Sequence, residues 1–194
     1  IESMEKAESD DSVVAIVLTG KGRSFIAGAD ISEFGQQIDG PSIHDAFEKI
    51  EKSSKPVIAA INGSALGGGL ETALCCHYRV SSKQGFIGLP EVNLGLLPGA
   101  GGTQRLPRLV GPAEALKIML SGRHISAVKA VDMGVIDSLS EGDIVEDAIA
   151  FAKDVAKKNE THPLIRNLNE KVLAARGDEN IISEARALAA KTRK

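Results

Sequence analysis

The chain has 194 residues, a formal net charge of −3 and a hydrophobic fraction of 43%. This composition supports a folded core and excludes a disordered polar chain or a low-complexity fibre. The chain has no excess of basic residues that would indicate nucleic acid or an anionic membrane surface as a partner. It also has no apolar run near the roughly 20 residues that a membrane helix needs.

Short apolar runs and amphipathic segments alternate through the first two-thirds of the chain. In chain order they predict strands at 13–19 and 25–31, a helix at 43–53, a strand at 56–61, a helix at 70–76, strands at 78–81 and 85–88, helices at 112–120 and 126–133, and a strand at 135–139. Residues 94–102 are rich in Gly and Pro and predict a loop.

The last third predicts only helices, at 144–157, 163–175 and 181–190. The fold class is therefore α/β with a helical C-terminal region. We expect a division into a core of residues 1–140 and a helical region of residues 141–194.

Three consecutive glycines, Gly67 to Gly69, follow a predicted buried strand and precede a helix. Glycines let a backbone approach a ligand closely, and a helix N-terminus presents N–H groups and a positive dipole end. The stretch predicts a site for an oxyanion. A tightly packed strand-to-helix turn explains it equally well.

Glu71 and Glu91 each lie in an apolar segment beside glycines. A carboxylate in such surroundings is costly unless it is paired or used, and burial raises its pKa toward the range of a general acid. The two residues therefore suggest an acid–base pair. The structural alternative is that each caps a helix or binds an arginine such as Arg79 or Arg105.

The remaining candidates carry weaker signals. Residues 25–30 have small side chains that would let the Ala29 N–H reach a ligand, although a plain turn explains them too. The adjacent Cys75 and Cys76 predict buried, reduced thiols, and no metal-ligand spacing is present. The four histidines, His77 among them, are expected at the surface or as caps.

Three stretches together resemble the crotonase family, that is, the enoyl-CoA hydratase/isomerase superfamily: SFIAGADISEF, KPVIAAINGSALGGGLE and GLPEVNLGLLPGAGGTQRLPRLVG. The resemblance covers about residues 13–139. GGGLETALCCHYRV and LPRLVG are most similar to the hydratase half of multifunctional fatty-acid oxidation enzymes, whose 3-hydroxyacyl-CoA dehydrogenase part has no counterpart here. The resemblance implies a spiral of ββα units with a helical C-terminal region.

The resemblance also assigns roles to residues. It implies that the Ala29 and Gly68 N–H groups form an oxyanion hole for the thioester oxygen, and that Glu71 and Glu91 are the catalytic carboxylates. The implied acyl-CoA contacts, with Arg23 meeting the CoA phosphates, are Arg23, Ala27, Gly28, Asp30 and Ile31.

The expected function is hydration of 2-enoyl-CoA thioesters in fatty-acid β-oxidation, with Δ3–Δ2-enoyl-CoA isomerisation open as a further activity. Hydration needs a base for water, an acid for the α-carbon and donors for the enolate. Two alternatives stay open: an isomerase or other acyl-CoA enzyme of the family, and an inactive acyl-CoA-binding fragment.

The family pattern sets further expectations. Two strands and a helix normally precede the strand at 13–19, so we expect a chain that lacks its N-terminal strands, with residues 1–8 as the end of that helix. We expect acyl-CoA as substrate with no cofactor or metal, and either a trimer-type homo-oligomer or a fused dehydrogenase domain. Reduced cysteines favour a bacterial cytoplasm, with a peroxisome as the alternative.

Overall fold

Two small sheets organise the chain in the computed structural model, which describes residues 1–28, 40–158 and 160–192. The larger sheet is parallel and has the order β1 (Ile16–Thr19), β2 (Val57–Ile61), β4 (Tyr78–Ser82) and β7 (Ser138–Ser140). The smaller sheet has the order β3 (Ser64–Leu66), β5 (Phe86–Gly88) and β6 (Ile125–Ser126), with β6 antiparallel. The predicted α/β class is confirmed.

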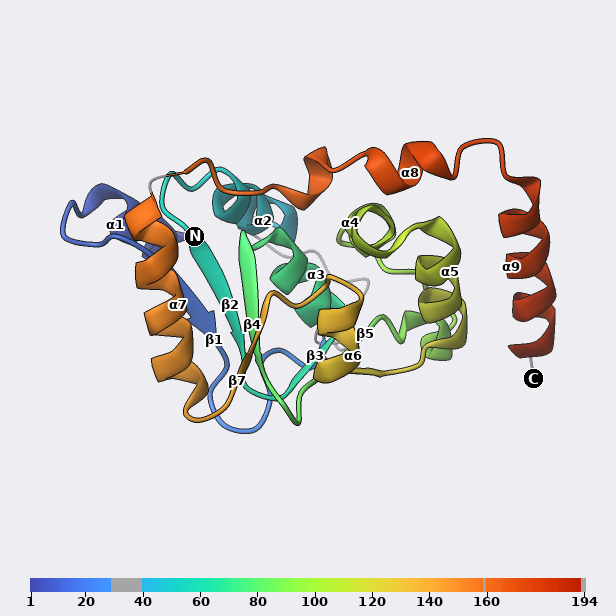
Figure 1. Cartoon of the computed structure of the whole chain (residues 1–194), viewed down its shortest axis with the longest axis horizontal. Coiled ribbons are helices and arrows are strands. Elements are labelled where there is room, and N and C mark those ends of the chain that lie inside the picture. The colour runs from blue at the N-terminus through green and yellow to red at the C-terminus, as the bar shows by residue number, and fades with distance from the viewer. Residues whose placement is uncertain (29–39, 159, 193–194) are drawn as a thin grey trace.

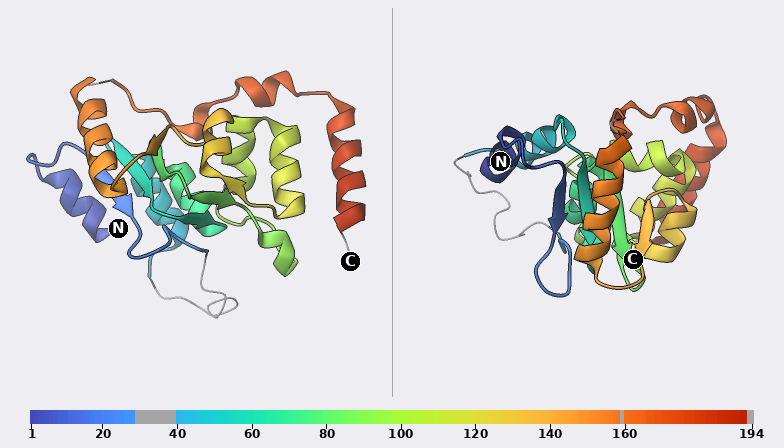
Figure 2. Two further views of the ribbon diagram at one scale, coloured as in Figure 1. Left: turned by 60° about the horizontal axis from the view of Figure 1, so that its bottom comes forward. Right: turned by 60° about the vertical axis from the view of Figure 1, so that its left-hand side comes forward.

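Helices cover both faces of the larger sheet (Figures 1 and 2). The helix α7 (Ile144–Lys158) packs on one face, and α2 (Ile43–Glu51) with α3 (Gly68–Cys75) covers the other. The remaining elements are α1 (Glu2–Ser9), α4 (Gly102–Val110), α5 (Pro112–Ser121), α6 (Ala127–Asp132), α8 (Glu170–Ala174), α9 (Glu179–Thr192) and the short 3-10 helices η2 (Glu91–Leu94) and η3 (Ile165–Asn167). None of the helices described is long and apolar enough to cross a membrane.

The central strand β2 explains why the segment at 56–61 is apolar without alternation. Val57, Ala59 and Ile61 face the core beneath α2 and α3, whereas Ile58 and Ala60 pack against α7. All five side chains are fully buried. A parallel strand that is covered on both faces needs this continuous apolar run.

The structure departs from the sequence predictions in several elements. The segment after residue 101 forms α4, which the sequence analysis missed because of its glycines and the internal Pro107. The predicted helix at 163–175 is divided into η3 and α8. Of the predicted strand at 25–31, the described part makes a single bridge between Ile26 and Ala65.

The C-terminal segment wraps the second half of the chain. It passes through η3 and α8 beside α4 and ends in α9, which lies along α5 (Figure 1).

The expected surface position of His77 is wrong. Its side chain is 1% exposed, and its Nδ1 accepts a hydrogen bond from the Val57 N–H at 2.9 Å. The ring lies 5.1 Å from that of His162. Burial, together with His162, lowers the pKa of His77 to about 4. The neutral imidazole thus completes the hydrogen bonding of a strand end.

The packing of β2 against α7 predicts a large effect of cavity formation there. Replacing Ile58 by Ala should lower the free energy of unfolding by about 2–5 kcal/mol, because it removes buried apolar atoms and leaves a cavity in the core. Val14→Ala, at a side chain that is 59% exposed, should change it by less than about 0.5 kcal/mol. Urea unfolding of the two variants checks this, and equal midpoints would contradict the packing.

The depressed pKa of His77 predicts a pH dependence of folding. Below its ordinary value of 6.5 the unfolded chain binds a proton that the folded chain does not take up until about pH 4. The contribution of His77 to the free energy of unfolding is therefore fully present above pH 6.5. It is lost as the pH falls from 6.5 toward 4, by up to about 1.4 kcal/mol per pH unit.

Asn at position 77 keeps an acceptor for the Val57 N–H and cannot titrate. Denaturant titrations between pH 4 and 7 should show a flatter pH dependence in His77→Asn than in the wild type. Parallel curves would mean that His77 is not a buried neutral group.

Candidate active site

The glycine-rich turn between β3 and α3 brings two parts of the backbone together. The Leu66 N–H donates to the Ile26 carbonyl at 3.1 Å, so the segment 26–28 runs beside the end of β3. A Cβ added to Gly69 would lie 1.9 Å from the Ile26 oxygen. Only glycine fits at that position, and the N-terminus of α3 and segment 26–28 therefore form one wall.

A pocket of about 370 Å³ opens at this wall. Both predicted carboxylates line it, together with apolar side chains of the loop that follows Glu91. The lining residues are Ala27, Gly28, Ile43, Gly67, Gly68, Glu71, Pro90, Glu91, Leu94, Leu96, Leu97, Gly99 and Ala100.

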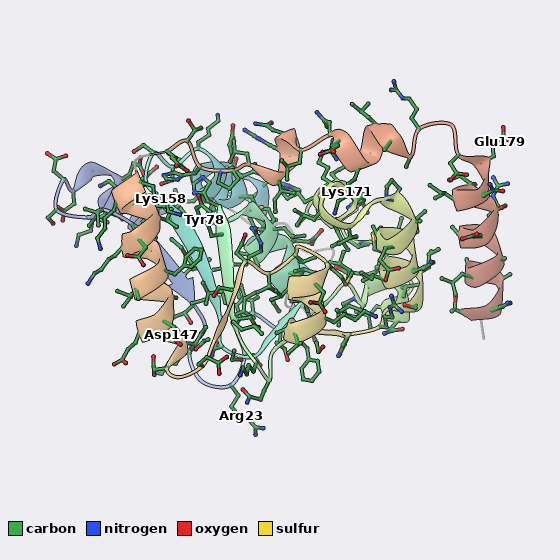
Figure 3. The ribbon with its side chains drawn as sticks, viewed as in Figure 1. Arg23, Tyr78, Asp147, Lys158, Lys171 and Glu179 are labelled. Atoms are coloured by element: carbon green, nitrogen blue, oxygen red, sulfur yellow. The ribbon has the colours of Figure 1, made fainter. Side chains whose placement is uncertain are left out.

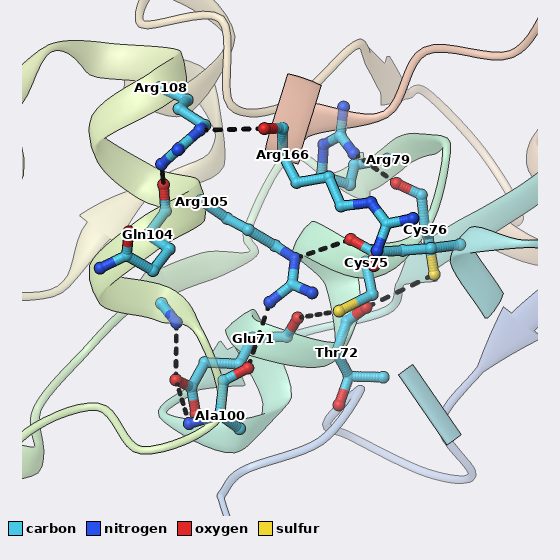
Figure 4. Close-up of polar contacts among 12 residues, drawn as sticks. Glu71, Thr72, Cys75, Cys76, Arg79, Ala100, Gln104, Arg105, Arg108 and Arg166 are labelled. Atoms are coloured by element: carbon cyan, nitrogen blue, oxygen red, sulfur yellow. Dashed lines mark hydrogen bonds and ion pairs between the residues drawn. The ribbon is translucent and has the colours of Figure 1, made fainter. Parts of the chain in front are cut away.

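Glu71 is held by backbone donors. Its side chain projects from the first turn of α3 and is 2% exposed. The N–H groups of Ala100 and Gly102 both donate to Oε1, each at 2.8 Å (Figure 4). The second oxygen, Oε2, has no hydrogen-bond partner among the described residues. Two backbone donors thus fix one oxygen of the Glu71 carboxylate.

Glu91 has a different environment. It begins η2, and its Oε2 is buried without a hydrogen-bond partner in the part of the chain that the structure describes. Burial, reinforced by the charge of Glu71, raises the pKa of the Glu91 carboxyl above its ordinary value. A proton on Glu91 is therefore available closer to neutral pH than on an ordinary carboxyl.

The structural alternatives for the two carboxylates have a mixed outcome. Glu71 does accept from Gly102, the first residue of α4, so it caps that helix. The arginine alternative is wrong for the pairs proposed. Arg79 binds Asp137 at 2.9 Å, and Arg105 binds Glu51 at 2.9 Å.

The other predicted site residues divide into three groups. Gly68, Ala27 and Gly28 line the pocket. Arg23 does not line it; its exposed side chain extends from the loop after β1 at the lower edge of the molecule (Figure 3). Ala29, Asp30 and Ile31 lie outside the described residues.

Sequence reasoning missed the groups that hold Glu71. The Gly-rich residues 94–102 predict a loop, but a glycine run directly before a helix also indicates free N–H donors, which is the signal that could have found them. The pair of Glu51 and Arg105 gave no signal, because its members are far apart in the sequence.

A larger hollow lies elsewhere. It measures about 520 Å³ between α1 and α2, and its charged side chains pair with each other, as in Lys49 with Glu5 at 2.7 Å. Its other carboxylates are partnered as well, since Lys52 binds Glu48 and the Ser42 hydroxyl donates to Asp45. Among residues 1–28, 40–158 and 160–192, no three His, Cys, Asp or Glu side chains gather as a metal site.

Comparison with known proteins finds relatives that are named as bifunctional enzymes or enoyl-CoA hydratases. The chain is 49% identical over 151 residues to a peroxisomal bifunctional enzyme of Danio rerio, covering 78% of this chain and 21% of that relative. It is 43% identical over 173 residues to a probable enoyl-CoA hydratase of Bacillus subtilis (strain 168), covering 80% of this chain and 64% of the relative. The chain thus spans about a fifth of the first relative and less than two-thirds of the second.

The solved structures that resemble this chain include enoyl-CoA hydratases. An enoyl-CoA hydratase from Bacillus anthracis matches with a TM-score of 0.69 and 31% identity, over 99% of this chain and 79% of that one. The family model described as enoyl-CoA hydratase/isomerase matches residues 1–191. With its two-sheet α/β fold and its glycine-turn pocket, the chain belongs to the enoyl-CoA hydratase/isomerase family.

Proposed function

We propose that the pocket adds water to 2-enoyl-CoA thioesters, the hydration step of fatty-acid β-oxidation. The observation that carries the proposal is that Glu71 and Glu91 line one pocket at the N-terminus of α3. Family membership supports the same substrate class. Acyl-CoA is the substrate, and the reaction needs no further cofactor.

The N-terminus of α3 suits the charge that develops during hydration. Attack at Cβ moves electron density onto the thioester oxygen, and the N–H groups of a first helical turn have no acceptor within the helix. We assign the Gly68 N–H as one donor to that oxygen, and by family resemblance the Ala29 N–H as the second. Removal of one such donor typically costs about 10²–10³ in rate.

The different environments of the two carboxylates support different proposed roles. Glu91, whose pKa is raised, gives its proton to Cα. Glu71, with Oε1 held by two N–H groups, takes a proton from water through Oε2 while the water oxygen bonds to Cβ. One proton leaves water and one reaches carbon, so the reaction is balanced. Glu71 ends with the proton that Glu91 has lost, and transfer of that proton back to Glu91 restores the starting state.

The loop after Glu91 suits an acyl chain. Leu94, Leu96 and Leu97 line the pocket, and each is between 42% and 72% exposed. Apolar side chains at the rim of a polar site would be covered by a hydrocarbon tail. Arg23 remains the proposed contact of the CoA phosphates, and Asp30 and Ile31 remain proposed contacts of the acyl-CoA substrate.

Isomerisation of 3-enoyl-CoA thioesters is the second candidate function. Glu91 has an unpartnered buried oxygen and a raised pKa, which suits a single group that removes a proton from one carbon and returns it to another. This reaction would use the same oxyanion site and would not need Glu71 as a base.

The relatives also bear on partners and location. One of them is named a bifunctional enzyme, so we propose that this unit works beside a dehydrogenase part or in a homo-oligomer of trimer type. The proposed compartment is a bacterial cytoplasm, with a peroxisome as the alternative.

The acid–base assignment predicts strong losses on removing either carboxyl. Glu71→Gln and Glu91→Gln should each lower kcat for crotonyl-CoA hydration by about 10²–10⁴, because acid–base catalysis contributes that much. The measurement is the loss of conjugated thioester absorbance. Glu170→Gln, at an exposed position of α8, is the matched control and should keep full activity.

Binding should persist in both carboxyl variants, and titration with a saturated acyl-CoA checks it. Undiminished turnover in Glu91→Gln would refute the two-carboxylate mechanism. Binding by the wild type without turnover would favour a non-catalytic acyl-CoA-binding unit.

A substrate comparison separates hydratase from isomerase. With 3-enoyl-CoA as substrate, Glu91→Gln should abolish conversion to the conjugated thioester, whereas Glu71→Gln should retain at least about a tenth of it, since one carboxyl suffices to move the proton. Equal losses in the two variants would contradict an isomerase that depends on Glu91 alone.

A further inference from the structure

We propose that Arg105 and Glu51 are positioning residues that hold the carboxylate of Glu71 in its working orientation. The inference rests on the proposed function only in taking Glu71 as a catalytic group. It concerns side chains that do not line the pocket and act through the loop of residues 99–102.

The backbone of Ala100 connects the carboxylate of Glu71 with the ion pair of Arg105 and Glu51. The Ala100 N–H donates to Glu71 Oε1 at 2.8 Å, and the carbonyl of the same residue accepts from Arg105 Nη1 at 3.2 Å (Figure 4). The loop is therefore held at one side by Arg105 and presents its N–H to Glu71 on the other. A shift of this loop moves the donor of Glu71.

Arg105 is itself fixed by a buried acid. Its Nε donates to Glu51 Oε1 at 2.9 Å, and the side chains are 12% and 3% exposed. Its guanidinium carbon lies 5.9 Å from the centre of the Phe47 ring. The second oxygen of Glu51 binds Arg166 Nη1 at 3.1 Å, which ties the pair to η3.

The guanidinium of Arg105 packs against the backbone at Gly101, where a side chain would not fit. Gly101 has φ of +101°, and a Cβ added there would lie 2.1 Å from Arg105 Nη1. A side chain at residue 101 would therefore displace the guanidinium from the loop. A lysine in this position offers one point charge, which cannot reproduce the two directions of the guanidinium fork.

Stability alone is a poor explanation for the pair. Desolvation of two buried charges offsets much of their attraction, so apolar replacements are often as stable. A planar fork that bonds Glu51 and Ala100 at once instead supplies orientation. Glu91 has no such support, since its buried oxygen is unpartnered among the described residues.

The test compares one substitution at two positions of α4. Arg105→Lys keeps the charge beside Glu51 but loses the fork, and kcat for crotonyl-CoA should fall about 10–100-fold with KM within about threefold. Arg108→Lys is the matched control, because Arg108 bonds the carbonyls of Gln104 and Arg166 and not the loop. Its kcat should stay within about twofold of the wild type. Equal kcat in the two variants overturns the proposal.

A double-mutant cycle distinguishes positioning from general loosening. In a Glu71→Gln background the effect of Arg105→Lys on kcat should shrink to less than about twofold, because the group through which Arg105 acts is gone. In a Glu91→Gln background the full effect should remain. An undiminished effect in both backgrounds overturns the proposal.

Hydrogen exchange gives a readout that does not need activity. The Ala100 and Gly102 amides should exchange at least about tenfold faster in Arg105→Lys than in Arg108→Lys, with the amides of α3 unchanged. Wild-type protection of both amides in Arg105→Lys refutes the inference. If Arg105→Lys does not fold, Glu51→Gln replaces it, with the same expectations.

The two proposals fail in different ways. A wild-type chain that does not hydrate crotonyl-CoA refutes the proposed function, and the exchange measurement then still decides whether Arg105 holds the loop.

Discussion

The hydrogen bonds that satisfy the buried carboxylate of Glu71 connect the elements around the pocket. Glu71 is 2% exposed, and the N–H groups of Ala100 and Gly102 satisfy its Oε1. An unsatisfied carboxylate in that place would be costly. The loop of residues 99–102 thus contacts α3 through these two N–H groups, and α4 begins at the second donor, Gly102. The candidate catalytic carboxylate of Glu71 is thus also the cap of α4.

The two pocket carboxylates lie in unequal surroundings. Glu71 is bound by two donors, whereas Glu91 has a buried oxygen without a partner among the described residues and a raised pKa. Two identical side chains thus acquire different chemistry from their surroundings. The asymmetry suits one group that accepts a proton and another that donates one.

Support for the site extends well beyond the pocket. The β2 strand, buried on both faces, fixes the sheet from which the chain enters β3 and the glycine turn. Glu51 of α2 binds both Arg105 of α4 and Arg166 of η3. Elements from distant parts of the sequence therefore converge on one loop, which explains how a small pocket can have a defined geometry.

The sequence by itself determined the local features. The apolar run at 56–61 predicted a strand covered on both faces, and the glycines at 67–69 predicted a helix N-terminus beside a backbone approach. Glu71 and Glu91 were identified because a carboxylate in an apolar segment is unusual. Each of these signals lies within a few neighbouring residues, where periodicity, turn preference and burial cost act.

Only the tertiary structure decided the rest. It decided that Ala100 and Gly102 bind Glu71, that Glu51 and not Glu71 binds Arg105, and that His77 is buried beneath His162. It also formed α4 around Pro107, where local preference argued against a helix. These contacts join residues far apart in the chain, and their partners are chosen by packing and by the need to satisfy buried polar groups, which no local pattern records.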